Sequence, residues 1–229
     1  MPLNLSICPA VLGVCNAPHS SVSFRNERNR NHFFNHSSQF NLLQPTLKTQ
    51  RMTTPLFIHA SAQSPSALHD SLLGLQAEYL SWVHREMARC TPEVELPQAN
   101  GDVDVVQALC AGLSTGSALY LIEVDGKAAG MCGLRRLAGN IAEIKRLYVR
   151  PAYRGMQLGS SALQRLLADA HRWGHTHLCL DTAPFMEAAH RLYDTHGFTD
   201  CAAYEGTEVP VAWHSQWRFM QRSIAPARP

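Results

Sequence analysis

Residues 143–160 read EIKRLYVRPAYRGMQLGS, and this segment decides the fold. Its first part, up to Val149, is rich in β-branched and aromatic residues, which predicts a strand. Pro151 ends that strand because proline cannot donate to a sheet ladder. The backbone can then turn at Gly155 and Gly159. Apolar residues follow at helical spacing, at Leu158, Ala162, Leu163, Leu166, Leu167 and Ala170.

The predicted loop between this strand and this helix has the properties of a phosphate-binding site. Free backbone N–H groups and the positive end of the helix dipole meet there, beside the positive side chain of Arg154. Two well-known phosphate motifs do not fit. No Lys-Ser or Lys-Thr pair follows the glycines as in the nucleotide P-loop, and the glycine spacing differs from the Rossmann fingerprint.

The segment resembles the pyrophosphate loop of the GCN5-related N-acetyltransferase (GNAT) superfamily, R/Q-x-x-G-x-G/A after a strand ending in L-Y-V and R-P. The matching positions are Leu147-Tyr148-Val149, Arg150-Pro151, Tyr153-Arg154-Gly155 and Leu158-Gly159. One position departs, because Gln157 stands where the family usually has the first motif glycine. A second match is the A-x-x-L-Y-x-x-x-G-F end of a family helix, at Ala189, Leu192, Tyr193, Gly197 and Phe198.

The resemblance implies a fold and an activity. The fold is α/β, a three-layer α/β/α arrangement with a central mixed, mostly antiparallel sheet. That sheet is splayed at the cofactor site, between the strand ending at Val149 and the strand ending at Thr182. The activity is transfer of an acetyl group from acetyl-CoA, a co-substrate, to the amine of a small molecule or a protein, by direct attack in a ternary complex. A non-catalytic acyl-CoA-binding regulatory module stays open as the alternative.

The family pattern also implies the site residues. Glu143 lies four residues before Leu147, where the histone-acetylating branch carries its general base; a surface residue paired with Lys145 or an arginine is the other interpretation. Tyr193 matches the general acid that protonates the leaving thiolate, or else is a core tyrosine. The residues expected to bind the co-substrate are Leu147, Tyr148, Val149, Arg154, Gly155, Met156, Gln157, Leu158, Gly159 and Ser160.

Composition limits the remaining function classes. A chain of 229 residues that is 45% hydrophobic can bury one sizeable core, and a net charge of +2 is too small to indicate a nucleic-acid partner. No apolar run approaches the roughly 18 residues of a membrane helix, so we expect no membrane partner. Seven scattered cysteines indicate reduced thiols in an intracellular protein. We expect no metal, although His171, His175 and His177 cluster around one turn, and either a monomer or a homodimer.

Residues 1–51 differ in composition from the rest. They are rich in Asn and Ser, are basic apart from Glu27, and lack periodicity, so we expect a disordered N-terminal extension. Such a segment is either a transit segment for a mitochondrion or plastid, or an extended gene start with Met52 as the working initiator. We favour the second interpretation and expect a cytoplasmic N-acetyltransferase (GNAT) domain over residues 52–229.

Within this domain the sequence predicts a regular order of elements. A strand over 56–60 precedes a long helix over 66–87 and a shorter one over 102–113. Strands over 118–124 and 127–134 flank Asp125-Gly126, which is a strong hairpin signal. A strand over 141–149, the loop and its helix, a strand over 177–182 and a helix over 184–196 follow. The last predicted element is a hairpin that closes with residues 211–221.

Overall fold

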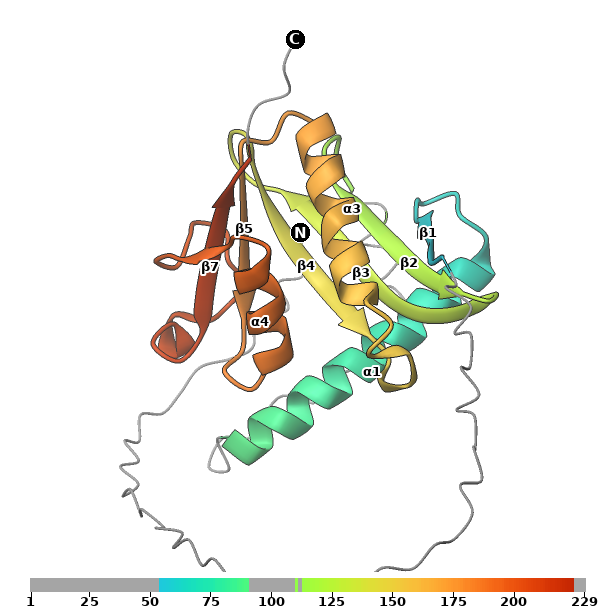
Figure 1. Cartoon of the computed structure of the whole chain (residues 1–229), viewed down its shortest axis with the longest axis horizontal. Helices are drawn as coiled ribbons and strands as arrows, with labels where there is room; N and C mark the ends of the chain where they lie inside the picture. The colour runs from blue at the N-terminus through green and yellow to red at the C-terminus, as the bar shows by residue number, and fades with distance from the viewer. Residues whose placement is uncertain (1–53, 91–109, 111–112, 225–229) are drawn as a thin grey trace, which may run out of the picture. The chain divides into compact units, whose positions relative to one another are not determined.

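The computed structural model describes residues 54–90, 110 and 113–224. Their core is a seven-stranded sheet in the order β1-β2-β3-β4-β5-β7-β6 (Figure 1). The strands are β1 (Leu56–His59), β2 (Ala118–Val124), β3 (Lys127–Arg136), β4 (Ile141–Val149), β5 (His177–Thr182), β6 (Thr199–Asp200) and β7 (Arg218–Ser223). Only β4 and β5 run parallel, and the other neighbours are antiparallel. The predicted mixed, mostly antiparallel sheet is confirmed.

Helices cover both faces of this sheet, as predicted (Figure 1). On one face, α3 (Leu158–Arg172) and α4 (Glu187–Thr195) share a core cluster with Ile144 of β4, to which α3 contributes Leu163 and Leu166. On the other face, α1 (Ser66–Cys90) buries Leu72 and Leu75 against β2 and β3. With one hydrophobic cluster on each face, the helices and the sheet form the three layers of an α/β/α arrangement. The helix predicted over 102–113 falls largely, and the extension over 1–51 entirely, outside the described residues.

Two of the predicted turns have the backbone that their residues favour. Asp125 and Gly126 have φ angles of 50° and 72°, as a type I′ hairpin turn requires. Gly197, with φ of 77°, follows the C-cap of α4, where a residue without Cβ enters the left-handed region at little cost.

The last predicted element is wrong in its first half. Residues 211–221 do not form one closing strand, because Val211–Trp213 is a 3-10 helix and β7 begins only at Arg218. The backbone bonds locally instead: the N–H groups of Gln216 and Trp217 donate to the Trp213 carbonyl. The Trp213 and Trp217 rings stack with centroids 5.4 Å apart. Residues 211–217 therefore form a turn with stacked tryptophans, and β7 pairs with β5 and the two-residue β6.

The sheet opens between its two parallel strands. β4 pairs with β5 only from Ile141 to Glu143, opposite His177 to Cys179. Beyond these three pairs the strands diverge, and in Figure 1 they separate toward the bottom of the view. We call this region the β4–β5 parting. It leaves the last residues of β4 bonded to β3 alone, which is the splayed arrangement expected between Val149 and Thr182.

Candidate active site

The loop after β4 is preorganised by two left-handed residues. A 3-10 turn over Pro151–Tyr153 leads to Gly155, with φ of 82°, and to Gln157, with φ of 58° and ψ of 16°. Gln157 thus keeps the backbone conformation that a glycine adopts freely, although a side chain there costs about 1 kcal/mol. The departure from the family pattern changes the side chain and leaves the turn in place.

This turn leaves a run of backbone N–H donors without a backbone acceptor in the loop. Among the described residues, no backbone N–H from Gly155 to Ser160 donates to a backbone carbonyl, and the first helical bond runs from Ser161 N to Gln157 O at 3.0 Å. The Arg154 guanidinium lies beside the loop, 6.0 Å from the Trp82 ring centroid. Free amides at a helix N-terminus with a nearby arginine fit a pyrophosphate group.

The Ser160 side chain, in contrast, is already bonded within the protein. Its Oγ lies 3.0 Å from Nε2 of His196, whose Nδ1 lies 2.8 Å from the Leu192 carbonyl oxygen. A carbonyl can only accept, so Nδ1–H donates to it, and Nε2 of the neutral ring accepts from the Ser160 hydroxyl. Only the backbone N–H of Ser160 is therefore left for an anion. The bond also joins the start of α3 to the end of α4.

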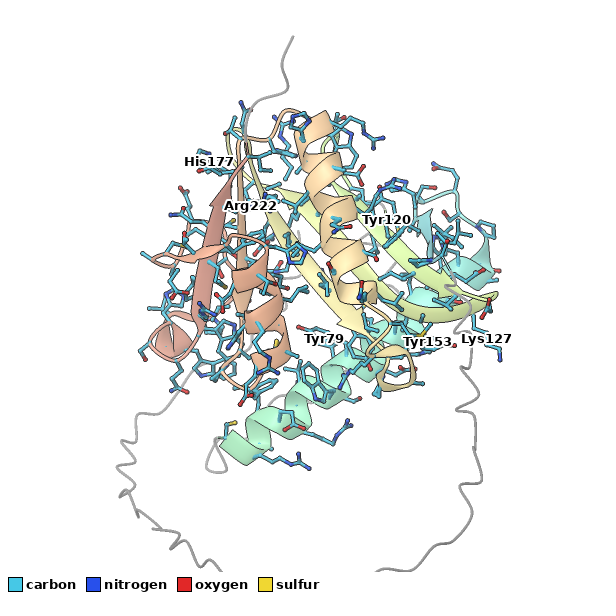
Figure 2. The ribbon with its side chains drawn as sticks, viewed as in Figure 1. Tyr79, Tyr120, Lys127, Tyr153, His177 and Arg222 are labelled. Atoms are coloured by element: carbon cyan, nitrogen blue, oxygen red, sulfur yellow. The ribbon has the colours of Figure 1, made fainter. Side chains whose placement is uncertain are left out.

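Aromatic side chains of α1 lie across the β4–β5 parting. The Tyr79 ring lies 5.8 Å from that of Tyr148 on β4, and the Trp82 ring lies 5.5 Å from that of Phe185, just after β5. Tyr79 is labelled on α1 near the end of β4 in Figure 2. One helix thus contacts both sides of the parting, with Leu147 and Val149 packing on the α3 side of the sheet.

Glu143 is buried and fully partnered. Its side chain has 0% exposure, and Oε2 accepts from Arg135 Nε at 2.7 Å. Oε1 accepts from the Tyr204 hydroxyl at 2.7 Å and lies 3.5 Å from Lys145 Nζ. Burial raises the pKa of Glu143, while Lys145 and Arg135 oppose that rise. The expected pairing with Lys145 or an arginine is present with both, but in the interior and not at the surface.

Tyr193 lies on the other side of the sheet, in the core cluster of α3 and α4. It is 6% exposed, and its ring centroid lies 5.7 Å from that of Phe198. Its hydroxyl makes no hydrogen bond with any residue in the described ranges. Burial raises the pKa of Tyr193 well above its usual value, and the charge of Asp181 adds to the rise. The phenol is therefore held neutral and able to donate.

Sequence reasoning missed Asp181 of β5. Its Oδ2 lies 3.2 Å from the Tyr204 hydroxyl oxygen and its Oδ1 accepts from Trp217 Nε1 at 3.3 Å. Asp181 is the one acidic residue in β5, whose residues 177–182 read HLCLDT, and that interruption was the available signal. Tyr204 lies in the segment between β6 and β7. The structure places its hydroxyl between the carboxylates of Glu143 and Asp181.

The histidine cluster has structural partners. His175 is buried with Nε2 2.9 Å from the Gly116 carbonyl oxygen, and His177 Nδ1 lies 3.0 Å from the Thr176 hydroxyl. Within the described ranges, no group of three or more His, Cys, Asp or Glu side chains is arranged to hold a metal ion. No helix in those ranges has the length and apolar character needed to cross a bilayer.

Comparison with known proteins places this geometry in a family. The model of the acetyltransferase (GNAT) family matches residues 83–198, which hold β2 to α4, the loop and Tyr193. The chain belongs to the GNAT family.

Individual relatives are similar over the same core. An uncharacterized N-acetyltransferase of Schizosaccharomyces pombe is 31% identical over 96 residues, 42% of this chain and 59% of that protein. N-acetylaspartate synthetase of Xenopus tropicalis is 29% identical over 101 residues, 44% of this chain and 37% of that protein. The chain thus matches less than two thirds of the length of these relatives.

Solved structures have the same fold. The PaiA N-acetyltransferase of Thermoplasma acidophilum, solved in complex with coenzyme A, aligns with a TM-score of 0.55 at 14% identity, over 75% of this chain and 99% of that one. An acetyltransferase of Streptococcus agalactiae aligns with a TM-score of 0.55 at 18% identity, over 74% of this chain and 98% of that one.

Proposed function

We propose that this protein is an N-acetyltransferase that uses acetyl-CoA and moves the acetyl group to an amine by direct attack. One observation carries the proposal. The backbone amides from Gly155 to Ser160, which have no backbone acceptor among the described residues, follow directly on the open edge of β4. This edge borders the β4–β5 parting, and Tyr193 and Glu143 lie on opposite faces of the sheet there. A loop alone would suit a binding module, whereas acid and base groups beside the parting suit a reaction.

The chain's residues divide the binding of the co-substrate between two elements. The loop amides and Arg154 would hold the pyrophosphate. The open edge of β4 from Leu147 to Val149 would pair with the amide groups of pantetheine, as an added strand does. Met186 stands where many family members have an asparagine that bonds pantetheine, so that contact would be absent or supplied by backbone groups. A β4 backbone N–H would then stabilise the oxyanion of the tetrahedral intermediate.

Proton handling completes the reaction. The amine nitrogen attacks the thioester carbonyl carbon, the C–N bond forms, the C–S bond breaks, and one proton leaves the nitrogen while one reaches the sulfur. Tyr193 would donate to the thiolate, since its phenol is held neutral. Glu143 would take the amine proton by way of the half-buried Tyr204, whose hydroxyl bonds Oε1. The burial that raises the pKa of Glu143 makes its carboxylate a stronger base.

The test is release of free CoA from acetyl-CoA in the presence of a panel of amines, with the acetylated product identified by mass. The panel covers polyamines, amino acids, arylalkylamines and peptides. Amine-dependent CoA release with a matching acetylated product is the expected result. Tight acetyl-CoA binding by calorimetry, with no amine-dependent release across the panel, would overturn the enzyme and leave a binding module.

A further inference from the structure

The charged side chains on the α1 side of the parting are mostly neutralised by one another. Arg135 and Lys145 face Glu143, and both also bind Glu208, with Lys145 Nζ 2.7 Å from Glu208 Oε2 and Arg135 NH1 2.9 Å from Glu208 Oε1. These two cations and two carboxylates therefore satisfy each other. Two further charges in the same region do not share in this network of ion pairs.

Arg146 is the first of them. It lies in β4 in the left-handed conformation, with φ of 54°, and its Nε donates to the side-chain oxygen of Gln76 on α1 at 3.1 Å. It makes no ion pair with any residue in the described ranges. Burial lowers the pKa of Arg146, and the charge of the Glu208 carboxylate opposes that drop without an ion pair. An arginine of this kind presents a planar set of donors to an anion from outside the chain.

Asp181 is the second. It lies two residues beyond Cys179, the last residue of β5 that pairs with β4, and so borders the parting. Its carboxylate oxygens have only neutral partners: Trp217 Nε1, the Tyr204 hydroxyl and, at 3.5 Å, the Thr207 hydroxyl. It too makes no ion pair with a described residue. The Tyr204 hydroxyl has a single hydrogen and a shorter bond to Glu143, so Asp181 keeps acceptor capacity for a cation.

The charges of Arg146 and Asp181 both affect the pKa of Tyr79. Burial raises the pKa of Tyr79 to about 12, with the Asp181 carboxylate adding to the rise and the Arg146 guanidinium opposing it. Tyr79 lies on α1, next to Tyr148 near the end of β4 (Figure 2). Arg146 on β4, which bonds Gln76 of α1, and Asp181 on β5 thus lie on the two strands that border the parting.

We propose that Arg146 and Asp181 select an acceptor that is itself zwitterionic, an amino acid, whose carboxylate binds Arg146 and whose ammonium binds Asp181. This inference rests on the proposed N-acetyltransferase function. Bidentate binding of a carboxylate by arginine fixes orientation as well as charge. The ammonium at Asp181 would lie beside the Tyr204 hydroxyl, which leads to Glu143, so the departing proton has a route to the base.

The experiment compares matched acceptors. The twenty standard amino acids are assayed first with acetyl-CoA, and the best is compared with its carboxamide and its decarboxylated amine, which lack only the carboxylate. We expect kcat/KM for the amino acid to exceed both by roughly 10- to 100-fold, the range of a charge-assisted hydrogen bond. Equal or higher kcat/KM for the carboxamide and the decarboxylated amine would overturn the inference and leave the acetyltransferase intact.

Variants assign the preference to the two residues. Arg146→Gln should reduce kcat/KM for the amino acid by roughly tenfold more than it reduces kcat/KM for the carboxamide, and Arg146→Lys should fall between. Asp181→Asn should reduce kcat/KM for all three acceptors. The matched control is Arg172→Gln, an exposed arginine at the end of α3 that pairs with Asp169. Melting temperatures of all variants check that each remains folded.

Binding provides a readout that does not need turnover. In the presence of CoA, calorimetry with each of the twenty standard amino acids in turn should detect at least one that binds the wild-type protein and not Arg146→Gln. If no amine is acetylated but this difference in binding appears, the proposed reaction fails and the amino-acid site stands. If Arg146→Gln alters neither amino-acid binding nor acceptor preference, the amino-acid site fails, whatever the enzyme acetylates.

Discussion

Arg135 binds Glu143 through two nitrogens at one carboxylate oxygen, with Nε 2.7 Å from Oε2, and the carboxylate has no exposure to solvent. The arginine comes from β3 and the glutamate from β4, directly opposite in the antiparallel register. A buried carboxylate without its counter-ion is strongly destabilising, so this pair is required by the fold as well as near the proposed chemistry.

Replacing Arg135 with Met should therefore destabilise the protein by about 3 kcal/mol or more, because Glu143 would remain buried without its arginine. Chemical denaturation measures the loss. Arg136→Met, a change at the next residue, is the control and should alter stability little. Combining Arg135→Met with Glu143→Gln should recover part of the loss; strictly additive losses would contradict the coupling.

Replacing Tyr193 with Phe should reduce kcat by about 10²-fold or more, since the thiolate would lose its proton donor. Stability and acetyl-CoA affinity should change little, because the phenol makes no hydrogen bond to a described residue and the ring packing with Phe198 remains. Steady-state kinetics and calorimetry separate the two effects. Full turnover by Tyr193→Phe on the best acceptor would give the acid role to water or to another residue.

Replacing Glu143 with Gln should lower the rate most near neutral pH. There the acceptor is mainly an ammonium that must lose a proton, and as the pH rises toward the amine pKa of about 10, free amine accumulates and the need for a base declines. The variant should thus regain part of its rate in alkali, shifting the kcat/KM profile to higher pH. Glu208→Gln is the control, and an unshifted profile in Glu143→Gln would rule out the base role.

Replacing Arg154 with Ala should weaken CoA binding by roughly tenfold or more, as expected when a charge-assisted phosphate contact is lost. The melting temperature should stay the same, because among the described residues the side chain donates only to the Val149 carbonyl, at 3.3 Å, beside its contact with Trp82. Calorimetry with CoA and with dephospho-CoA measures the change. An affinity equal to that of the wild-type protein would remove Arg154 from the pyrophosphate site.

Replacing Gln157 with Gly should raise the free energy of unfolding by up to about 1 kcal/mol, since glycine adopts a φ of 58° without the Cβ clash. CoA affinity should be kept, as the backbone already has the required turn. Gly155→Ala is the opposite change, placing a side chain at φ of 82°, and should lower stability. A gain in stability from Gly155→Ala would contradict this account of the loop.

The sequence predicted the elements whose signals are local. Asp125-Gly126 predicted the hairpin turn, Gly197 the end of α4, and Pro151 the end of β4, since each signal depends on the conformations that the residue's own backbone allows. The turn over 211–217 was mistaken for a strand because its local pattern does not reveal that Trp213 stacks on Trp217 or that the backbone bonds within the turn.

The candidate site was only partly predictable, because some of its contacts join residues that are far apart in the sequence. Glu143 and Tyr193 stood out by their positions in known motifs. The links between Tyr204, Glu143 and Asp181 join β4, β5 and the segment before β7, which lie far apart along the chain. Whether Glu143 is exposed or enclosed also depends on residues from β3 and that distant segment. Local patterns carry no information about such pairings.

The three residue pairs that join β4 to β5 also have a consequence for cooperativity. The ladder from Ile141 to Glu143 is the only strand pairing between β1–β4 and the unit of β5, β7 and β6 in the described sheet. Local opening of the latter unit breaks few ladder bonds, so its free energy depends on the side-chain bonds and core packing that join the two parts. A molecule bonded to β4 and packed on β5 would bridge the junction. Its binding energy would then slow hydrogen exchange in β7, at amides it never touches.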